Sequence, residues 1–203
     1  ILIMGAGAVI MLVGGINWAW VGGALGAAAA MMYFVLFVIG YNASRITYWL
    51  DPWEDAQGSG YQLSQSLLSI GSGGLLGVGL GKSRQKFMFL PEEHNDFIFA
   101  IVCEELGLIG AGIIMLLFAA LILRGYWIAL HARDRFGSLM VVGIITLIAL
   151  QTFLNIGVVT GLLPTTGISL PFFSYGGTAL SMQLAEMGIV LSVSRQMRPT
   201  KAG

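Results

Sequence analysis

The sequence predicts an all-α membrane protein, a polytopic bundle of transmembrane helices, from three observations. Residues 1–44 carry no charged side chain, and residues 138–185 form a second charge-free stretch of similar length. Only 10% of the residues are charged, against about 25% in an ordinary globular domain. Apolar runs such as 31–40 and 113–123 do not alternate with polar residues as the strands of a membrane barrel do, so the spans are helices.

Five spans are expected, and the whole chain, 1–203, forms one membrane domain. A bilayer core of about 30 Å needs roughly 20 apolar residues per helix. The expected spans cover residues 1–13, 21–41, 97–123, 139–160 and 178–194, with a tight uncharged turn at 14–20. Because the first span is short, we expect the chain to be a fragment that lacks earlier helices.

The connecting segments predict the topology. The short loop 124–137 holds three arginines and one aspartate, and the tail 195–203 holds three basic residues. Two spans separate these segments, so both lie on one side, which the positive-inside rule makes the cytoplasm. Residues 42–96, a large loop, and 161–177 are then both extracytoplasmic, and we expect them to form one site.

Composition excludes several classes of function. The net charge is zero, so nothing indicates a nucleic-acid partner. Cys103 is the single cysteine, which excludes a disulfide framework and a cysteine-based metal site.

The first half of the large loop predicts a short amphipathic helix at the membrane surface. Gln62, Gln65, Ser66 and Ser69 follow helical spacing, with leucine and isoleucine on the other side. The glycine-rich residues 71–81 must be irregular.

Basic residues follow this glycine-rich segment. Lys82 and Lys86 could contact phosphates or lipid headgroups, or they could simply belong to a solvated basic turn.

The densest polar cluster, residues 92–96, lies directly before the third span and has three interpretations. Asn95 or Asp96 could cap the helix. Glu92, Glu93, His94 and Asp96 could bind a metal ion, although they lack a zinc-type spacing. A carboxylate here could also act as a general base, because low dielectric at the bilayer edge raises the pKa of a carboxyl group.

Glu104, Glu105 and Glu186 lie inside predicted spans. A carboxylate at such depth is costly and usually faces a cavity or a partner. Adjacent residues point about 100° apart on a helix, so we expect one of Glu104 and Glu105 to face the interior. A polar groove and a structural hydrogen bond between helices are the two interpretations.

The segment 161–177 predicts a re-entrant element. Its sequence, GLLPTTGISLPFFSYGG, has too much glycine and proline for a spanning helix and is too apolar for a free loop. A segment packed on protein satisfies both constraints. Its hydroxyl groups could satisfy backbone groups or line a substrate groove.

Ordered motifs make the chain resemble the SEDS family of peptidoglycan glycan-strand polymerases. The resemblance covers about residues 45–194, and the pair Gln85-Lys86 is closer to the division (FtsW) and sporulation (SpoVE) branches than to the elongation (RodA) branch. The motifs are DPWED at 51–55, GYQ at 60–62, GLGKSRQK at 79–86, LPEEHNDFIF at 90–99, EELG at 104–107, NIG at 155–157 and residues 161–177.

The resemblance implies a multi-pass protein of the bacterial plasma membrane, with the active site on the extracytoplasmic face. The family's essential acidic residue corresponds to Asp96, and the substrate would be lipid II, a disaccharide-pentapeptide on undecaprenyl pyrophosphate. The partners would be a monofunctional class B penicillin-binding protein (a transpeptidase), divisome membrane proteins and membrane lipid. Family members have about ten spans, so the chain alone is not expected to be a competent enzyme.

The expected reaction is strand polymerisation for the division septum. Asp96 would act as the general base, and cations, with a divalent ion such as Mg²⁺ or Mn²⁺ as one option, would stabilise the pyrophosphate leaving group. The alternatives are a lipid II flippase and a non-catalytic scaffold for the penicillin-binding protein. Residues expected to contact substrate are Arg45, Gln65, Ser66, Lys82, Lys86, His94, Glu104, Glu105, Thr166, Ser174 and Tyr175.

Overall fold

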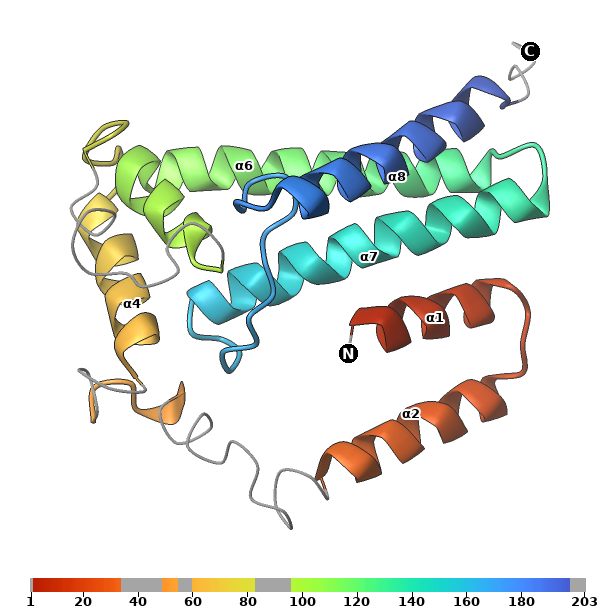
Figure 1. Ribbon diagram of the computed structural model, residues 1–203, viewed down its shortest axis with the longest axis horizontal. Coiled ribbons are helices and arrows are strands. Elements are labelled where there is room, and N and C mark those ends of the chain that lie inside the picture. The colour runs from red at the N-terminus through yellow and green to blue at the C-terminus, as the bar shows by residue number, and fades with distance from the viewer. Residues whose placement is uncertain (1, 34–48, 55–59, 83–95, 198–203) are drawn as a thin grey trace.

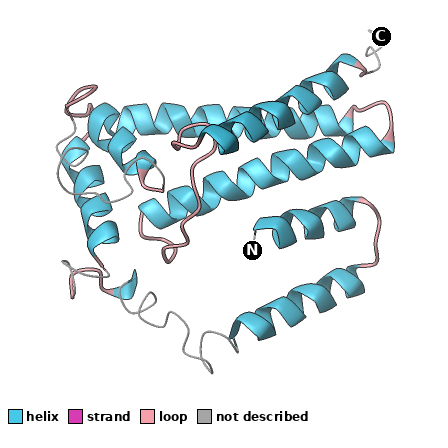
Figure 2. Cartoon of the chain, in the orientation of Figure 1, coloured by secondary structure: helices cyan, strands magenta, loops and turns pink. Residues whose placement is uncertain are grey.

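The described chain is all-helical, with long helices side by side and one shorter helix across an end of the bundle (Figures 1 and 2). The structure is a computed structural model that describes residues 2–33, 49–54, 60–82 and 96–197. Within these ranges the helices are α1 (Leu2–Val13), α2 (Trp18–Tyr33), α4 (Tyr61–Gly73), α6 (Ile98–Leu130), α7 (Arg135–Val159) and α8 (Gly177–Arg195).

Each predicted span corresponds to one of these helices, so the predicted fold class is confirmed. Within the described ranges, α6 and α7 are long and apolar enough to cross a membrane, and α1 is a shorter apolar helix. The end of the second predicted span, residues 34–41, lies outside the described residues.

The helix α6 continues seven residues beyond its predicted end at residue 123. It runs past Arg124, whose guanidinium carbon lies 4.1 Å from the centre of the Trp127 ring. This contact stabilises the charge by a cation–π interaction while the aliphatic stem covers apolar surface. A charged residue therefore did not end the helix as the sequence pattern predicted.

Two apolar clusters hold α6, α7 and α8 together. One surrounds Phe97, Phe118, Val159 and Leu170, close to the 161–176 segment. The other lies at the opposite end of α7 and includes Ile128, Val141, Ile145 and Val190. Gly125 allows close packing there, because a Cβ on it would meet the side chain of Ile145.

The helix α6 is broken at Gly107, where the sequence predicted a continuous span. Gly107 has φ 68° and ψ −171°, so the chain leaves the helical conformation and then resumes it. The bend is visible at the light-green end of α6 in Figure 1. In a regular helix Leu108 and Ile109 would donate to the carbonyls of Glu104 and Glu105, and the break removes both hydrogen bonds.

Residues 73–79, here called the glycine strap, replace the lost hydrogen bonds. The strap donates from Val78 N to Glu104 O (3.0 Å) and from Gly79 N to Glu105 O (3.1 Å). It also accepts, at Gly74 O from Leu108 N (2.9 Å) and at Leu75 O from Ile109 N (3.2 Å). All four backbone groups freed by the break are thus satisfied within protein, as the interior of a membrane requires.

The strap lies so close to α6 that only glycine fits at the contact. A Cβ on Gly77 would lie 2.5 Å from the carbonyl carbon of Glu105, and one on Gly107 would lie 2.6 Å from that of Leu75. Gly77 also has a positive φ of 78°. The predicted irregular conformation of residues 71–81 is confirmed from Gly74 onward. In this conformation the segment supplies the hydrogen bonds that α6 has lost at its break.

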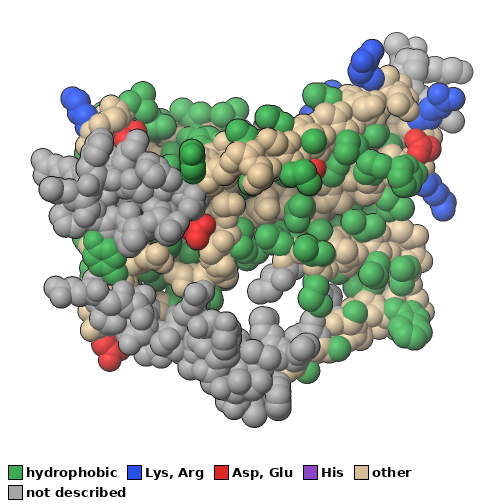
Figure 3. Space-filling view, in the orientation of Figure 1, with side chains coloured by type: hydrophobic (Ala, Val, Ile, Leu, Met, Phe, Trp, Pro, Cys, Tyr) green, Lys and Arg blue, Asp and Glu red, His purple; other side chains and the backbone are tan. Residues whose placement is uncertain are grey.

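Most of the visible Lys and Arg side chains lie at one end of the bundle, while acidic side chains occur at both ends and midway along it (Figure 3). Lys and Arg gather mainly at the end where the α6–α7 turn and the last turn of α8 lie (Figure 3). Arg133, Arg135 and Arg195 are exposed there. The two basic segments thus lie at the same end of the bundle, as the predicted topology requires, and the assignment of this end to the cytoplasm stays a prediction.

Candidate functional site

The helix α4 forms as predicted, but its serine side faces protein. Ser64, Ser66 and Ser69 are buried, whereas Leu68 is 46% exposed. Ser66 donates a 2.8 Å hydrogen bond to the carbonyl of Val159, the last residue of α7. The small serines and Gly73 allow α4 to lie directly against the backbone of α6 and α7, and the packing face of the helix combines these serines with the buried Leu63.

Asp96 lies immediately before α6, beside the 161–176 segment. A Cβ built on Gly167 would be 3.5 Å from Oδ2 of Asp96. Asp96 is half-buried, which leaves part of its surface open. The N-cap of α6 is Phe97, which makes no side-chain capping hydrogen bond, so Asp96 does not occupy the capping position, and Asn95 lies outside the described residues.

Asn155 joins the two chain segments of this site. From α7, its Nδ2 donates 2.7 Å to the carbonyl of Asp96 and 2.8 Å to the carbonyl of Ile168. Asn155 is 1% exposed. The predicted convergence of the large loop and the 161–177 segment is therefore observed at this amide.

Side chains from outside the 161–176 segment satisfy much of its backbone. Trp49 Nε1 donates to Gly161 O (2.8 Å), and Gln183 Oε1 accepts from Phe172 N (2.8 Å). Within the segment, Ser174 Oγ accepts from Leu170 N (2.8 Å). Leu170 is 1% exposed. The segment is non-helical and packed on protein, and its predicted depth in the membrane stays a prediction.

The two glutamates beside the α6 break differ in burial, as their spacing predicted. Glu104 is 2% exposed, while Glu105 is half-buried. Oε1 of Glu105 is itself buried and has no hydrogen-bond partner in the described part of the chain. Glu186 is half-buried in α8. These carboxyl groups are polar positions inside the predicted spans.

The remaining predicted contact residues fall into three groups. Arg45, Lys86 and His94 lie outside the described residues. Lys82, Thr166 and Tyr175 are exposed, and Gln65 and Ser174 are half-buried. Ser66 is fully buried, so a direct contact with substrate would require the α4–α7 interface to open.

The predicted divalent ion finds no ready-made set of ligands in the described residues. No three His, Cys, Asp or Glu side chains gather there to hold a metal ion. Of the proposed metal-binding cluster, only Asp96 is described. The divalent cation stays a prediction, and no chemical step below depends on it.

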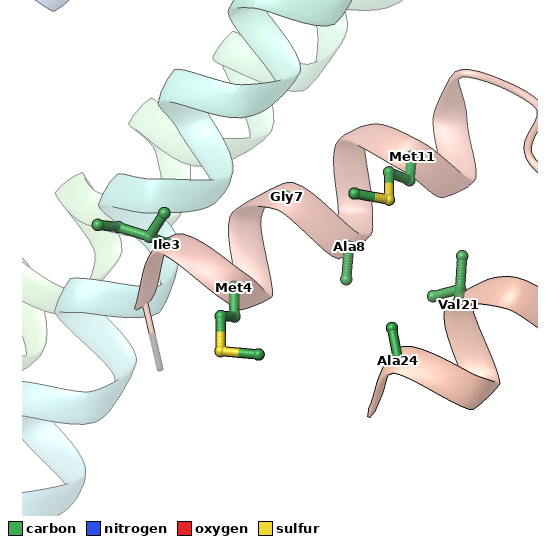
Figure 4. Close-up of a pocket in the computed structure, with 7 residues that line it drawn as sticks. All are labelled: Ile3, Met4, Gly7, Ala8, Met11, Val21 and Ala24. Carbon is green, nitrogen blue, oxygen red and sulfur yellow. The ribbon is translucent and has the colours of Figure 1, made fainter. Parts of the chain in front are cut away.

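Two apolar hollows lie on the helices. One, of about 210 Å³, lies between α1 and α2 (Figure 4) and is lined by Ile3, Met4, Gly7, Ala8, Met11, Val21 and Ala24. The other, of about 160 Å³, lies between α6 and the 161–176 segment and is lined by Ile114, Leu117, Phe118, Leu121, Phe172 and Phe173. The second is adjacent to the segment that contacts Asp96.

Sequence reasoning gave no role to Asn155, Trp49 or Gln183. Asn155 had a usable signal, because it is an amide inside a long charge-free span. Such a residue must find hydrogen-bond partners within the protein. Trp49 and Gln183 carried no comparable signal, since their partners are backbone groups of a distant irregular segment.

Comparison with known proteins gives concordant results. Residues 1–199 match the model of the FtsW/RodA/SpoVE family, described as cell cycle proteins. Stage V sporulation protein E of Bacillus subtilis is 58% identical over 158 residues, which are 78% of this chain and 43% of that protein. The probable peptidoglycan glycosyltransferase FtsW of Geobacter metallireducens is 46% identical over 200 residues, 98% of this chain and 53% of that protein.

Solved structures agree. A chain of a peptidoglycan synthase complex, studied for its coordination of polymerization and crosslinking, is 27% identical with a TM-score of 0.76, covering 98% of this chain and 55% of that one. The rod shape determining protein RodA of Thermus thermophilus is 28% identical with a TM-score of 0.61, covering 98% and 50%.

The chain spans about half the length of the curated relatives it matches. The family match nevertheless covers residues 1–199, and the solved structures share the helical fold. This chain therefore belongs to the FtsW/RodA/SpoVE family of membrane proteins.

Proposed function

We propose that the protein containing this chain polymerises peptidoglycan glycan strands from lipid II at the extracytoplasmic face of the bacterial plasma membrane, with Asp96 as general base. The observation that carries the proposal is the place of Asp96. Asp96 is half-buried, and its carboxyl group lies close to the 161–176 segment, where a Cβ on Gly167 would be 3.5 Å from Oδ2. The names of the relatives, peptidoglycan glycosyltransferases among them, support the same reaction class.

In the proposed reaction Asp96 takes the proton of the GlcNAc 4-hydroxyl of the incoming lipid II. The 4-oxygen forms a bond to the anomeric carbon of the lipid-linked growing strand. The bond from that carbon to the phosphate oxygen breaks, and the electron pair leaves with the polyprenyl pyrophosphate. The exposed Lys82 would favour that negative charge, and so would Arg45 and Lys86, which lie outside the described residues.

The rest of the site would bind the substrate. Exposed Thr166 and Tyr175, with half-buried Gln65 and Ser174, offer hydrogen bonds to sugar or peptide. The apolar hollow beside Phe172 and Phe173 offers a surface for the hydrocarbon part of the lipid. A class B penicillin-binding protein and other divisome membrane proteins would be its partners, in septum synthesis.

Purified full-length protein, supplied with labelled lipid II and its penicillin-binding partner, tests the proposal. Asp96→Asn keeps the size of the side chain but removes its basicity, so polymer should fall to background. Glu54→Gln is the matched control, because Glu54 is an exposed carboxylate in the same loop. Strand synthesis retained by Asp96→Asn would remove Asp96 from this role.

A lipid II flippase is the second candidate, favoured by the buried Glu104 and by Oε1 of Glu105, which has no hydrogen-bond partner among the described residues. The same preparation separates the candidates. Polymer supports the enzyme, and transfer of lipid II between leaflets without polymer supports the flippase. If neither activity is observed, the remaining candidate is a scaffold for the penicillin-binding protein.

A further inference from the structure

We propose that Asn155 is a positioning residue, which fixes the backbone of Asp96 against the 161–176 segment. The inference rests on the proposed function and adds to it a residue that touches no substrate. Its basis is the pair of hydrogen bonds from Nδ2, 2.7 Å to Asp96 O and 2.8 Å to Ile168 O.

The orientation of the amide follows from its partners. Both neighbours of this end of the side chain are carbonyl oxygens, which only accept hydrogen bonds, so the NH₂ group must face them. Each N–H of the amide serves one carbonyl. Oδ1 then points away and is buried without a hydrogen-bond partner in the described residues.

This arrangement favours positioning over general stabilisation. An unpaired buried oxygen is unfavourable, so the side chain is not arranged for the best hydrogen bonding of its own groups. What it achieves is a link between two chain segments 59 and 13 residues away in sequence. Asparagine is suited to this link, because serine and threonine have one donor and aspartate, when ionised, has none.

The link matters because the N-cap residue does not hold the start of α6 through its side chain. Phe97, the N-cap, makes no side-chain capping hydrogen bond. The break at Gly107 separates the first part of α6 from its long second part. Asp96 therefore directly precedes a short helical piece, and its backbone carbonyl is tied to α7 through Asn155.

Replacing Asn155 should lower turnover and leave substrate binding in place. In Asn155→Leu, a side chain of similar size has no donors, so both carbonyls are released. A shift of the base by about 1 Å is enough for a loss of about 100-fold in kcat. KM and the number of lipid II molecules bound per protein should stay within about threefold of wild type, because Asn155 is buried away from the substrate.

Thr152→Val is the matched control. Thr152 lies one turn earlier on α7, is 5% exposed, and donates only to Ile148 O within its own helix. Its loss removes a buried hydroxyl without touching Asp96, so kcat should change by less than about threefold. Asn155→Gln keeps both donors on a longer stem and should recover part of the lost turnover.

A measurement without catalysis separates this inference from the proposed function. Hydrogen–deuterium exchange in the full-length protein should become faster at 96–101 and 166–170 in Asn155→Leu, and unchanged there in Thr152→Val. If wild type makes no polymer, the proposed function fails, while exchange still tests the link.

Three results would overturn the inference. One is unchanged exchange at both segments in Asn155→Leu. Another is wild-type kcat in that variant despite faster exchange. The third is equal loss of bound lipid II and kcat, because partial unfolding alone lowers both.

Discussion

The backbone N–H of Val78 donates a 3.0 Å hydrogen bond to the carbonyl oxygen of Glu104, at the point where α6 has lost its own donor. In an unbroken helix Leu108 would fill that place. Val78 belongs to the glycine strap, which precedes α6 in the chain. The backbone hydrogen bonding of α6 on both sides of Gly107 therefore depends on a segment of the large loop.

The contact between the strap and α6 predicts that Gly107 tolerates no side chain. In Gly107→Ala, the new Cβ would meet Gly77 N and Leu75 O. The positive φ of 68° alone costs about 1–2 kcal/mol for alanine. With the steric conflict we expect a loss of about 3 kcal/mol or more in the free energy of unfolding in detergent.

Gly112→Ala is the control for this prediction. It lies in the same helix, and a Cβ there meets nothing within 4 Å. Alanine should leave stability unchanged or raise it by up to about 1 kcal/mol. Equal stability of the two variants would show that the strap is not closely packed on α6.

A second prediction concerns Ser66. Ser66→Ala removes the donor to Val159 O and leaves that buried carbonyl without its side-chain partner. We expect a loss of about 1–3 kcal/mol in the free energy of unfolding. Ser72→Ala, at an exposed position of the same helix, should change stability by less than about 0.5 kcal/mol. A stable Ser66→Ala protein that has lost polymerisation would instead support the predicted substrate contact.

A third prediction concerns the start of α7. Asp134 is the N-cap, and its Oδ2 accepts a 2.9 Å hydrogen bond from Gly137 N. Asp134→Ala should lower stability by about 1 kcal/mol, and Asp134→Asn by less, because asparagine also caps helices. The melting temperature in detergent measures both. The exposed neighbour Arg133→Ala should leave it unchanged, and an equal effect in Arg133→Ala would argue against capping.

The fourth prediction tests the orientation in the membrane. Cys103, the single cysteine of this chain, is buried, and it is replaced by serine together with any cysteine elsewhere in the full-length protein. In intact cells an impermeant maleimide should label Glu54→Cys, and it should label Arg133→Cys only after permeabilisation. The reverse pattern would place the candidate site in the cytoplasm and remove the proposed polymerase.

The helices were predictable because charge-free length is a direct requirement of the bilayer. In a chain with so few charges, the long apolar runs of α6 and α7 predict membrane-spanning helices. The family motifs also pointed to Asp96 as the residue of interest. Both inferences use properties that are local in the sequence.

The break in α6 and the link through Asn155 were not predictable in the same way. Gly107 reads as an ordinary glycine in an apolar span, because its φ is set by contact with Gly77. From the sequence, the serines of α4 are expected to face solvent, since the sequence does not show that backbone atoms of α6 and α7 would pack on them. These features depend on which distant segments meet, and that follows only from the assembled bundle.

The order of synthesis gives the glycine strap a further consequence. Translation produces residues 73–79 before α6, so the groups that complete the interrupted helix already exist when α6 leaves the ribosome. Unsatisfied backbone groups make the transfer of a helix into the hydrocarbon core unfavourable. We therefore expect the membrane insertion of α6 to depend on the glycine strap. A substitution that disrupts the strap should first reduce the amount of correctly inserted protein.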